Sequence, residues 1–180
     1  MKATGIVRRI DDLGRVVIPK EIRRTMRIRE GDPLEIYTNR DGEVIFKKYS
    51  PIGELSDFAS QYAETLYKTA GTPACITDKD TVIAISGAAK KDFIDKRLSD
   101  DIERILDEKS PFIQSGRDSK VPSVIDGEKY SAGIVVPIIS EGDTIGSVIM
   151  LKDSPEKALG DAEVKLAKAG AMFLAKQMEI

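Results

Sequence analysis

The 180-residue sequence contains no histidine, no tryptophan and a single cysteine, Cys75. The lack of histidine excludes His-based acid/base catalysis and the Ser-His-Asp and Cys-His triads, and one cysteine is too few for a Cys/His zinc site. One cysteine also cannot form an internal disulfide, which fits a reducing cytosol. We therefore predict a protein that is not an enzyme, with no catalytic residues, no metal and no cofactor.

Long hydrophobic segments are absent as well. The longest apolar stretch, Gly133–Ile139, is far shorter than the roughly 20 residues that cross a bilayer. Residues 1–12 carry charges where a signal peptide has its apolar region. These two features predict a cytoplasmic protein with no membrane partner.

The chain has almost no net charge, because 28 Lys and Arg residues oppose 30 Asp and Glu residues. The two signs are unevenly distributed: residues 1–50 carry a net charge of +4, and residues 51–180 carry −6. Residues 1–29 hold nine basic and three acidic residues, and seven of the nine are arginines. Arginine suits phosphates and guanine edges, but a basic cluster also occurs on solvated faces, so the placement of these residues must decide.

The first 50 residues have the pattern of a small β-rich unit. Strands are expected at Gly5–Ile10 and Arg15–Ile18, on either side of a turn, and Pro19 opens a short helix. A hairpin is expected from Leu34–Thr38 and Glu43–Lys47. A unit of this size is too small to close a core and has no metal ligands or disulfide, so we expect it to dimerise.

Two runs in this unit, Thr4–Pro19 and Glu21–Thr25, resemble the AbrB family of bacterial transition-state regulators. The resemblance implies a swapped-hairpin dimer, in which strands of two chains interleave into one β-barrel that binds double-stranded DNA. It also implies that five arginines contact the DNA: Arg8, Arg9, Arg15, Arg23 and Arg24. One or two of them are expected to pair with nearby carboxylates, such as those of Asp11, Asp12 and Glu21.

Other residues of the same unit are expected to be structural. Gly14 supplies backbone freedom in the turn, and Pro19 suits the start of the helix. Five aliphatic residues are expected in the interleaved core: Ile18, Ile22, Leu34, Ile36 and Ile45.

The pattern breaks at Tyr49–Gly53, which is the best candidate boundary between domains. Beyond it, apolar residues at helical spacing predict a helix over Glu54–Lys68. This helix packs either against its own downstream domain or in a bundle between subunits, and the sequence does not separate the two.

From Pro73 onwards the pattern alternates between strands and helices. Strands are expected over 74–77, 81–85, 112–114, 130–138 and 144–151, and helices over 90–108 and 161–178. Ile94, Leu98, Ile102 and Ile105 should form the buried face of the helix over 90–108. The stretch Ile134–Ile149 resembles the closing hairpin of GAF domains, which implies a GAF-like α+β domain. Cys75, in an apolar strand, is expected to be a small buried hydrophobe.

GAF domains share a fold and differ in what they bind, so the resemblance does not identify a ligand. The sequence has no histidine for haem and lacks the cysteine pair of GAF-like methionine sulfoxide reductases. A small-molecule ligand would be expected between the sheet and helix 90–108, beneath the loop Ser115–Lys129. The ligand-binding residues remain unknown, and the alternative is a domain that serves only for oligomerisation.

The sequence thus predicts an α+β protein with three parts: an AbrB-like DNA-binding domain over 1–50, a linker helix over 51–72 and a GAF-like domain over 73–180. This combination resembles a family of sporulation regulators. The resemblance implies a DNA-binding activator and repressor of late forespore genes, associated with the nucleoid. It also implies a dimer of dimers, joined through residues 1–50 and through the linker and C-terminal helices.

One alternative is an antitoxin-like module that binds a protein toxin, because swapped-hairpin proteins also neutralise toxins. Such proteins usually carry a disordered acidic tail that wraps the partner. Residues 51–180 are instead patterned for a fold, which favours the transcription regulator.

Overall fold

The computed structural model describes residues 4–115, 120–127, 130–152 and 159–178. The chain divides into an N-terminal unit, which ends at Tyr49, and a C-terminal unit, which begins at Ser50. The proposed ligand-covering loop, 115–129, lies partly outside the described residues. None of the described helices is both long enough and apolar enough to cross a bilayer.

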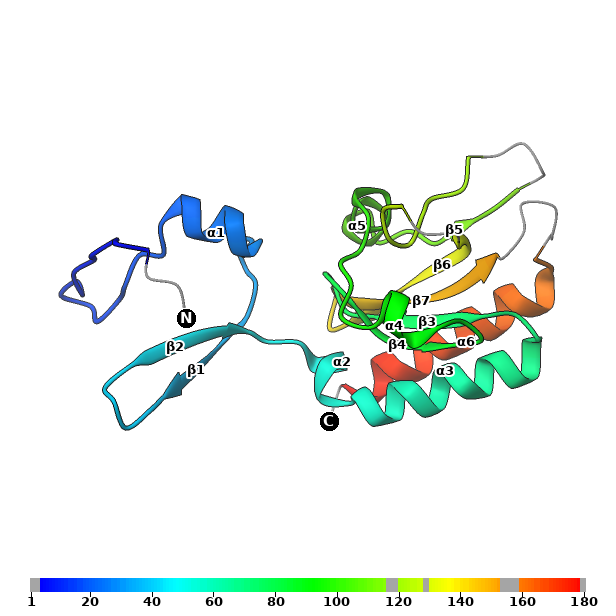
Figure 1. The fold of residues 1–180 in the computed structure, drawn as a ribbon, viewed down its shortest axis with the longest axis horizontal. Coiled ribbons are helices and arrows are strands. Elements are labelled where there is room, and N and C mark those ends of the chain that lie inside the picture. Colours follow the sequence, from blue (N-terminus) through cyan, green and yellow to red (C-terminus); the bar gives the residue numbers. More distant parts are fainter. Residues whose placement is uncertain (1–3, 116–119, 128–129, 153–158, 179–180) are drawn as a thin grey trace. The chain divides into compact units, whose positions relative to one another are not determined.

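The described residues of the N-terminal unit, 4–49, form one short helix, α1 (Lys20–Met26), and one hairpin of β1 (Leu34–Thr38) and β2 (Val44–Lys48) (Figure 1). The strands are antiparallel, and Ile36 lies opposite Phe46. The Asn39 side-chain oxygen accepts hydrogen bonds from the backbone N–H groups of Asp41 (3.1 Å) and Glu43 (2.9 Å), which closes the turn. The predicted helix and hairpin are therefore confirmed.

The two strands predicted over Gly5–Ile10 and Arg15–Ile18 are wrong for the single chain. Residues 4–19 contain no strand, and the two backbone hydrogen bonds described within them, from the N–H of Asp11 to the carbonyl of Arg15 and from the N–H of Gly14 to the carbonyl of Asp11 (3.0 Å each), close a turn. A strand requires a partner for its backbone groups, and no segment of the described chain lies beside this one as a partner. The β-barrel is likewise not closed within one chain, and it remains a prediction about the dimer.

The N-terminal unit has no core of its own. Among residues 4–49, only Pro19 is buried. The aliphatic side chains that the sequence places in an interleaved core lie at the surface or half-buried, and Ile36 is 62% exposed. Val7 is 89% exposed and Val17 69%. Exposed apolar surface of this kind is typical of interaction sites.

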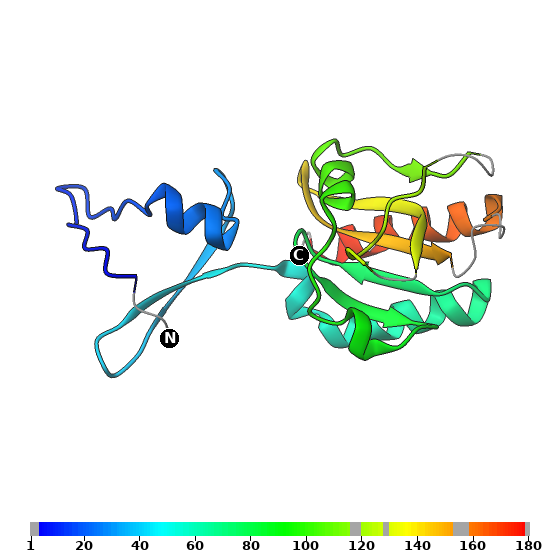
Figure 2. The ribbon, with the colours of Figure 1, turned by 45° about the horizontal axis from the view of Figure 1, so that its top comes forward.

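The C-terminal unit is built on a five-stranded antiparallel sheet with the order β4-β3-β7-β6-β5 (Figure 2). Its strands are β3 (Ala74–Thr77), β4 (Val82–Ser86), β5 (Phe112–Ile113), β6 (Ser131–Ser140) and β7 (Asp143–Lys152). All five strands were predicted, with ends that differ by at most two residues. The long β6–β7 hairpin is the part that resembles GAF domains in sequence.

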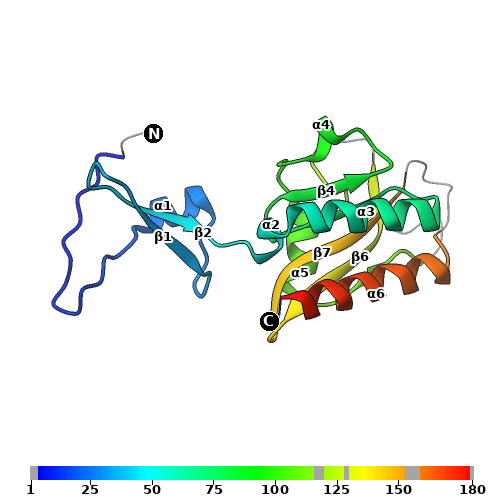
Figure 3. The same ribbon diagram turned by 90° about the horizontal axis from the view of Figure 1, so that it is seen from below.

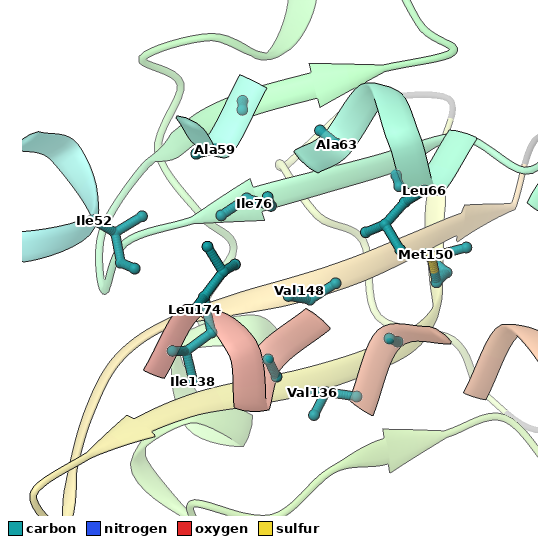
Figure 4. Close-up of a cluster of buried hydrophobic side chains, with 14 of the residues drawn as sticks. Ile52, Ala59, Ala63, Leu66, Ile76, Val136, Ile138, Val148, Met150 and Leu174 are labelled. Carbon is teal, nitrogen blue, oxygen red and sulfur yellow. The ribbon is translucent and has the colours of Figure 1, made fainter. Parts of the chain in front are cut away.

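One face of this sheet is covered by α2 (Pro51–Glu54), α3 (Ser56–Ala70) and α6 (Asp161–Gln177) (Figure 3). The core between these helices and the sheet includes Leu66 from α3, Leu174 from α6 and Ile76 from β3 (Figure 4). Helix α3 therefore packs against its own downstream domain, which was one of the two alternatives for the helix predicted over 54–68. It belongs to the same compact unit as the sheet.

The other face carries two short helices, α4 (Lys90–Phe93) and α5 (Asp100–Asp107), so the single helix predicted over 90–108 is wrong. The chain leaves α4 through Asp95, whose φ of 60° is not helical. Residues 95–97 then lie along the edge of β4, where the N–H of Val82 donates to the carbonyl of Lys96 (3.0 Å). Ser99 caps a new helix, since its side chain accepts from the N–H of Ile102 (3.3 Å).

A second core fills the space between the sheet and these helices. Its buried residues include Phe93 from α4, Leu98, Ile102 from α5, and Val124 and Ile125 from the segment after α5. The four aliphatic residues predicted to face inwards do so: Leu98 and Ile102 are buried, and Ile94 and Ile105 pack against this core. Cys75 is fully buried in it, and burial raises the pKa of its thiol, as expected for a structural cysteine.

Candidate nucleic-acid interface

All five arginines predicted to contact DNA lie in the N-terminal unit. Arg8, Arg9 and Arg15 belong to the loop before α1, and Arg23 and Arg24 belong to α1. Arg23 is half-buried, and the other four are exposed. The guanidinium groups thus come from two adjacent segments of the chain and are largely open to a partner.

One of the five arginines is held by a carboxylate, as the sequence led us to expect. Arg15 Nε donates to Asp11 Oδ2 at 2.9 Å, and the Arg15 side chain is 68% exposed. Within residues 4–49 and the rest of the described chain, the side chains of Arg8, Arg9, Arg23 and Arg24 form no ion pair. An exposed ion pair contributes little stability, so Arg15 can exchange its carboxylate for a phosphate at low cost.

Asp11 also shapes the turn that presents Arg15. Its Oδ1 accepts from the backbone N–H groups of Arg15 (2.7 Å) and Leu13 (3.0 Å), and Gly14 closes the turn at a φ of 75°. The backbone hydrogen bond from Arg15, with smaller contributions from its side chain and from Leu13, lowers the pKa of Asp11. A lowered pKa means that the turn favours the ionised carboxylate. The ionised Asp11 carboxylate therefore stabilises the folded turn when the pH is above the pKa of Asp11 in the unfolded chain. This stabilisation is lost as the pH falls through the pKa of Asp11 in the folded chain.

Helix α1 is fixed to the hairpin at its C-terminal end. Arg27 adopts a left-handed conformation there (φ 51°), and the N–H of Ile28 donates back to the carbonyl of Arg23 at 2.8 Å. Lys48 Nζ, at the end of β2, donates to the carbonyl of Arg27 (2.9 Å) and lies 3.7 Å from Asp32 Oδ2. The same Asp32 oxygen accepts from the N–H of Arg29 at 2.8 Å.

Lys48 and Asp32 therefore hold the helix that carries Arg23 and Arg24. Sequence reasoning missed both residues, because the Lys48 contact joins a side chain to a backbone carbonyl 21 positions away. The Gly31-Asp32-Pro33 turn was the only signal, and it indicated a chain reversal and not a lysine partner.

Both parts of the chain match known proteins. Residues 54–179 match a family model described as stage V sporulation protein T C-terminal, transcription factor. Stage V sporulation protein T of Bacillus subtilis (strain 168) is 54% identical over 181 residues, which cover 99% of each chain. The chain belongs to the stage V sporulation protein T family of transcription factors. The resemblance to a sporulation regulator, inferred from the sequence, is confirmed.

The N-terminal and C-terminal parts of this stage V sporulation protein T family chain also match different proteins. The transition state regulatory protein AbrB of Bacillus subtilis is 57% identical over 63 residues, which cover 32% of this chain and 65% of that protein. Residues 7–53 also match a model described as antidote-toxin recognition MazE, bacterial antitoxin. The GAF domain of a phosphoenolpyruvate-protein phosphotransferase from Coxiella burnetii matches with a TM-score of 0.56 and 15% identity, over 69% of this chain and 82% of that one. The AbrB-like and GAF-like predictions are both confirmed.

Proposed function

We propose that this chain regulates late sporulation genes, as activator and repressor, by binding double-stranded DNA through Arg8, Arg9, Arg15, Arg23 and Arg24. The observation that carries the proposal is the arginine-rich surface of the N-terminal unit. Residues 1–29 hold nine basic and three acidic residues, and four of the five arginines have no carboxylate partner among the described residues. Phosphates supply the negative charge that such a surface lacks.

The N-terminal unit acts as a dimer in this proposal. The support is its exposed apolar surface, because a swapped hairpin from a second chain would cover side chains such as Ile36 and Val17. The C-terminal unit would join two such dimers into a tetramer. In support, α6 exposes Met172 (67%) and Phe173 (42%), beside an aromatic contact in which the Phe58 and Phe173 ring centroids lie 5.7 Å apart.

The mode of DNA recognition follows from the elements that carry the arginines. Helix α1 has seven residues, too few for a long recognition helix, and the other arginines lie on a loop. Such cations anchor phosphates and reach groove edges without a fixed set of base contacts. We expect tolerant sequence preferences to which DNA shape contributes.

Replacing Arg8 or Arg23 with alanine tests this proposal. Each variant should bind several unrelated duplexes more weakly, on the order of tenfold, because a charge-assisted hydrogen bond contributes roughly 1.5–3 kcal/mol. The slope of log affinity against log salt should flatten by about 0.9 for each phosphate that the dimer no longer neutralises. Fluorescence anisotropy titrations at several salt concentrations measure both quantities.

The matched control is Arg40→Ala, which removes an exposed arginine of the same unit at the hairpin turn, outside the proposed set. It should leave affinity and salt slope close to those of the unmodified protein. Arg8→Ala and Arg23→Ala variants that behave like this control would overturn the assignment of those two residues.

A small molecule bound to the C-terminal unit would modulate DNA binding. The place we propose is between the sheet and the helices α4 and α5, where the chain's own Val124 and Ile125 now complete the second core. The GAF fold and the two-layer construction of this face support the proposal. A saturable rise in melting temperature of the full-length protein, in a screen of nucleotides and amino acids, is the expected result. A screen in which no compound raises it would leave this unit as an oligomerisation domain.

The remaining proposals concern what the protein does not do and where it acts. We propose no enzymatic activity, since the function assigned above uses no bond-breaking chemistry, and we place the protein on the nucleoid of the developing forespore.

An antitoxin function is the second candidate, favoured by the MazE match over residues 7–53. That match covers the shared N-terminal fold only, whereas the relation to stage V sporulation protein T extends over the whole chain.

A further inference from the structure

The division between the two units falls at Tyr49 and Ser50, and each of these residues is hydrogen-bonded within its own unit. On the N-terminal side, the backbone N–H of Tyr49 donates to the carbonyl of Pro33 at 3.1 Å. On the C-terminal side, Ser50 Oγ donates to Asp78 Oδ2 at 3.0 Å. Tyr49 and Ser50 are therefore each held by the unit to which they belong.

Ser50 has a second task at this point, because it is the N-cap of α2. Its Oγ accepts from the N–H of Gly53 at 3.1 Å, and Pro51 occupies the first turn. A Cβ at Gly53 would lie 2.9 Å from Ser50 Oγ, so glycine leaves room for this geometry. Ile52 is fully buried in the core of the C-terminal unit and fixes α2 there.

Asp78 is itself rigidly held in the turn between β3 and β4. Its Oδ1 accepts from the backbone N–H groups of Thr81 (2.7 Å) and Asp80 (2.8 Å), which leaves Oδ2 directed to Ser50. The carbonyl of Asp80 in turn accepts from the N–H of Leu98 at 2.9 Å, so the turn is joined to the segment that precedes α5. Ser50 is thus attached to a well-anchored part of the C-terminal unit.

We propose that Ser50 and Asp78 are positioning residues for DNA binding: their hydrogen bond fixes the direction in which the chain leaves the C-terminal unit and restricts the motion of the N-terminal unit. The inference rests on the proposed DNA binding. Without the bond, the backbone at Tyr49 and Ser50 samples more conformations, and binding DNA must then order them.

The replacement Ser50→Asp separates the two tasks of Ser50. Aspartate is also a good N-cap, so α2 is kept, but its charge repels Asp78 and breaks the positioning contact. Adding Asp78→Asn should restore the contact, because the amide nitrogen can donate to the new carboxylate while the amide oxygen keeps the bonds to Asp80 and Thr81. Ser56→Asp adds the same charge at the exposed start of α3 and is the matched control.

Motion of the N-terminal unit is measured by time-resolved fluorescence anisotropy of a dye on Asp41→Cys, in the exposed hairpin turn. Native Cys75 is fully buried, so the dye reacts at the new site. Ser50→Asp should add a fast segmental component to the anisotropy decay, and the Asp78→Asn addition should remove it. The duplex affinity of Ser50→Asp should fall about three- to tenfold and recover with the second change.

The outcomes separate this inference from the proposed function. An unchanged anisotropy decay in Ser50→Asp, or an unchanged duplex affinity despite faster motion, overturns the positioning role. The Ser56→Asp control should show neither change, and equal effects in both variants would likewise count against it. The DNA contacts themselves are tested by Arg8→Ala and Arg23→Ala, whose result does not depend on the junction.

Discussion

Replacing Ile36 with aspartate should abolish DNA binding, although the Ile36 side chain is 62% exposed in the single chain. In the proposed dimer this side chain is buried between two hairpins, so each dimer would bury two uncompensated carboxylates. Burying an unpaired charge costs several kcal/mol, which corresponds to a loss of affinity of about 100-fold or more. Anisotropy titration gives the affinity, and hydrogen exchange of the β1 and β2 amides reports whether the hairpin has opened.

The control for this prediction is Thr38→Asp, which adds the same charge two positions along β1. Thr38 is already polar and is the last residue of β1, beside the turn at Asn39, so we expect a carboxylate there to keep its contact with water in the dimer, and the affinity should change by no more than one added negative charge per chain implies. If Ile36→Asp were no more harmful than Thr38→Asp, Ile36 would remain exposed in the functional protein. The swapped-hairpin dimer would then be wrong.

Local sequence signals predicted the elements whose partners lie close by in the chain. The β1–β2 hairpin is an example, because the turn that joins the strands contains Asn39 and Gly42, and the side chain of Asn39 closes it. The β6–β7 hairpin is another, with its turn at Glu141 and Gly142. In both cases the residues that determine the fold lie within the segment that folds.

The wrong predictions of secondary structure occur where the residues that decide the structure lie outside the segment itself. Arg15–Ile18 is rich in β-branched residues, but its strand needs a partner that the single chain does not provide. The stretch over 90–108 has a helical apolar pattern throughout, yet the edge of β4 captures residues 95–97 and splits it. Periodicity indicated which side chains face the core and could not indicate this competing backbone pairing.

The candidate site shows the same division. Composition and the AbrB resemblance indicated the arginines as candidates, because the chemistry of phosphate binding is visible in residue type. Two contacts between distant parts of the sequence were not visible: Lys48 reaches the carbonyl of Arg27, and Ser50 reaches Asp78, across 21 and 28 positions respectively. Such contacts depend on tertiary structure and leave no local pattern.

The near-neutral charge of the chain acquires a meaning from the division into units. The first 50 residues carry +4 and the remainder −6, and the structure places the boundary between units at Tyr49 and Ser50. A negative C-terminal unit is repelled by the phosphates that the N-terminal unit attracts. In the proposed function, the opposite charges favour contact of DNA with the N-terminal unit.

The second large effect is expected from Gly146→Ala, in the middle of the β7 strand. A Cβ at this position would lie 2.0 Å from the carbonyl oxygen of Thr77 on β3, far inside van der Waals contact. Next to it, the fully buried hydroxyls of Thr77 and Ser147 form a hydrogen bond of 2.7 Å, so β3 cannot move away without breaking a buried polar pair. We expect a loss of about 3–5 kcal/mol in the free energy of unfolding and a fall in melting temperature on the order of 10 °C.

Gly160→Ala provides the matched control for this strand contact. The nearest atom to a Cβ there is Glu163 Oε2 at 3.3 Å, the end of a side chain that can move, and Gly160 has a negative φ that alanine tolerates. Thermal unfolding followed by circular dichroism should therefore leave Gly160→Ala within about 1 kcal/mol of the unmodified protein. Equal melting temperatures for the two variants would mean that β3 and β7 can separate at Gly146, and that the tight Thr77 contact does not set the spacing of the sheet. A loss of stability in Gly146→Ala that Gly160→Ala does not share would instead show that β3 and β7 pack too closely at the Thr77 carbonyl to accept one more carbon atom.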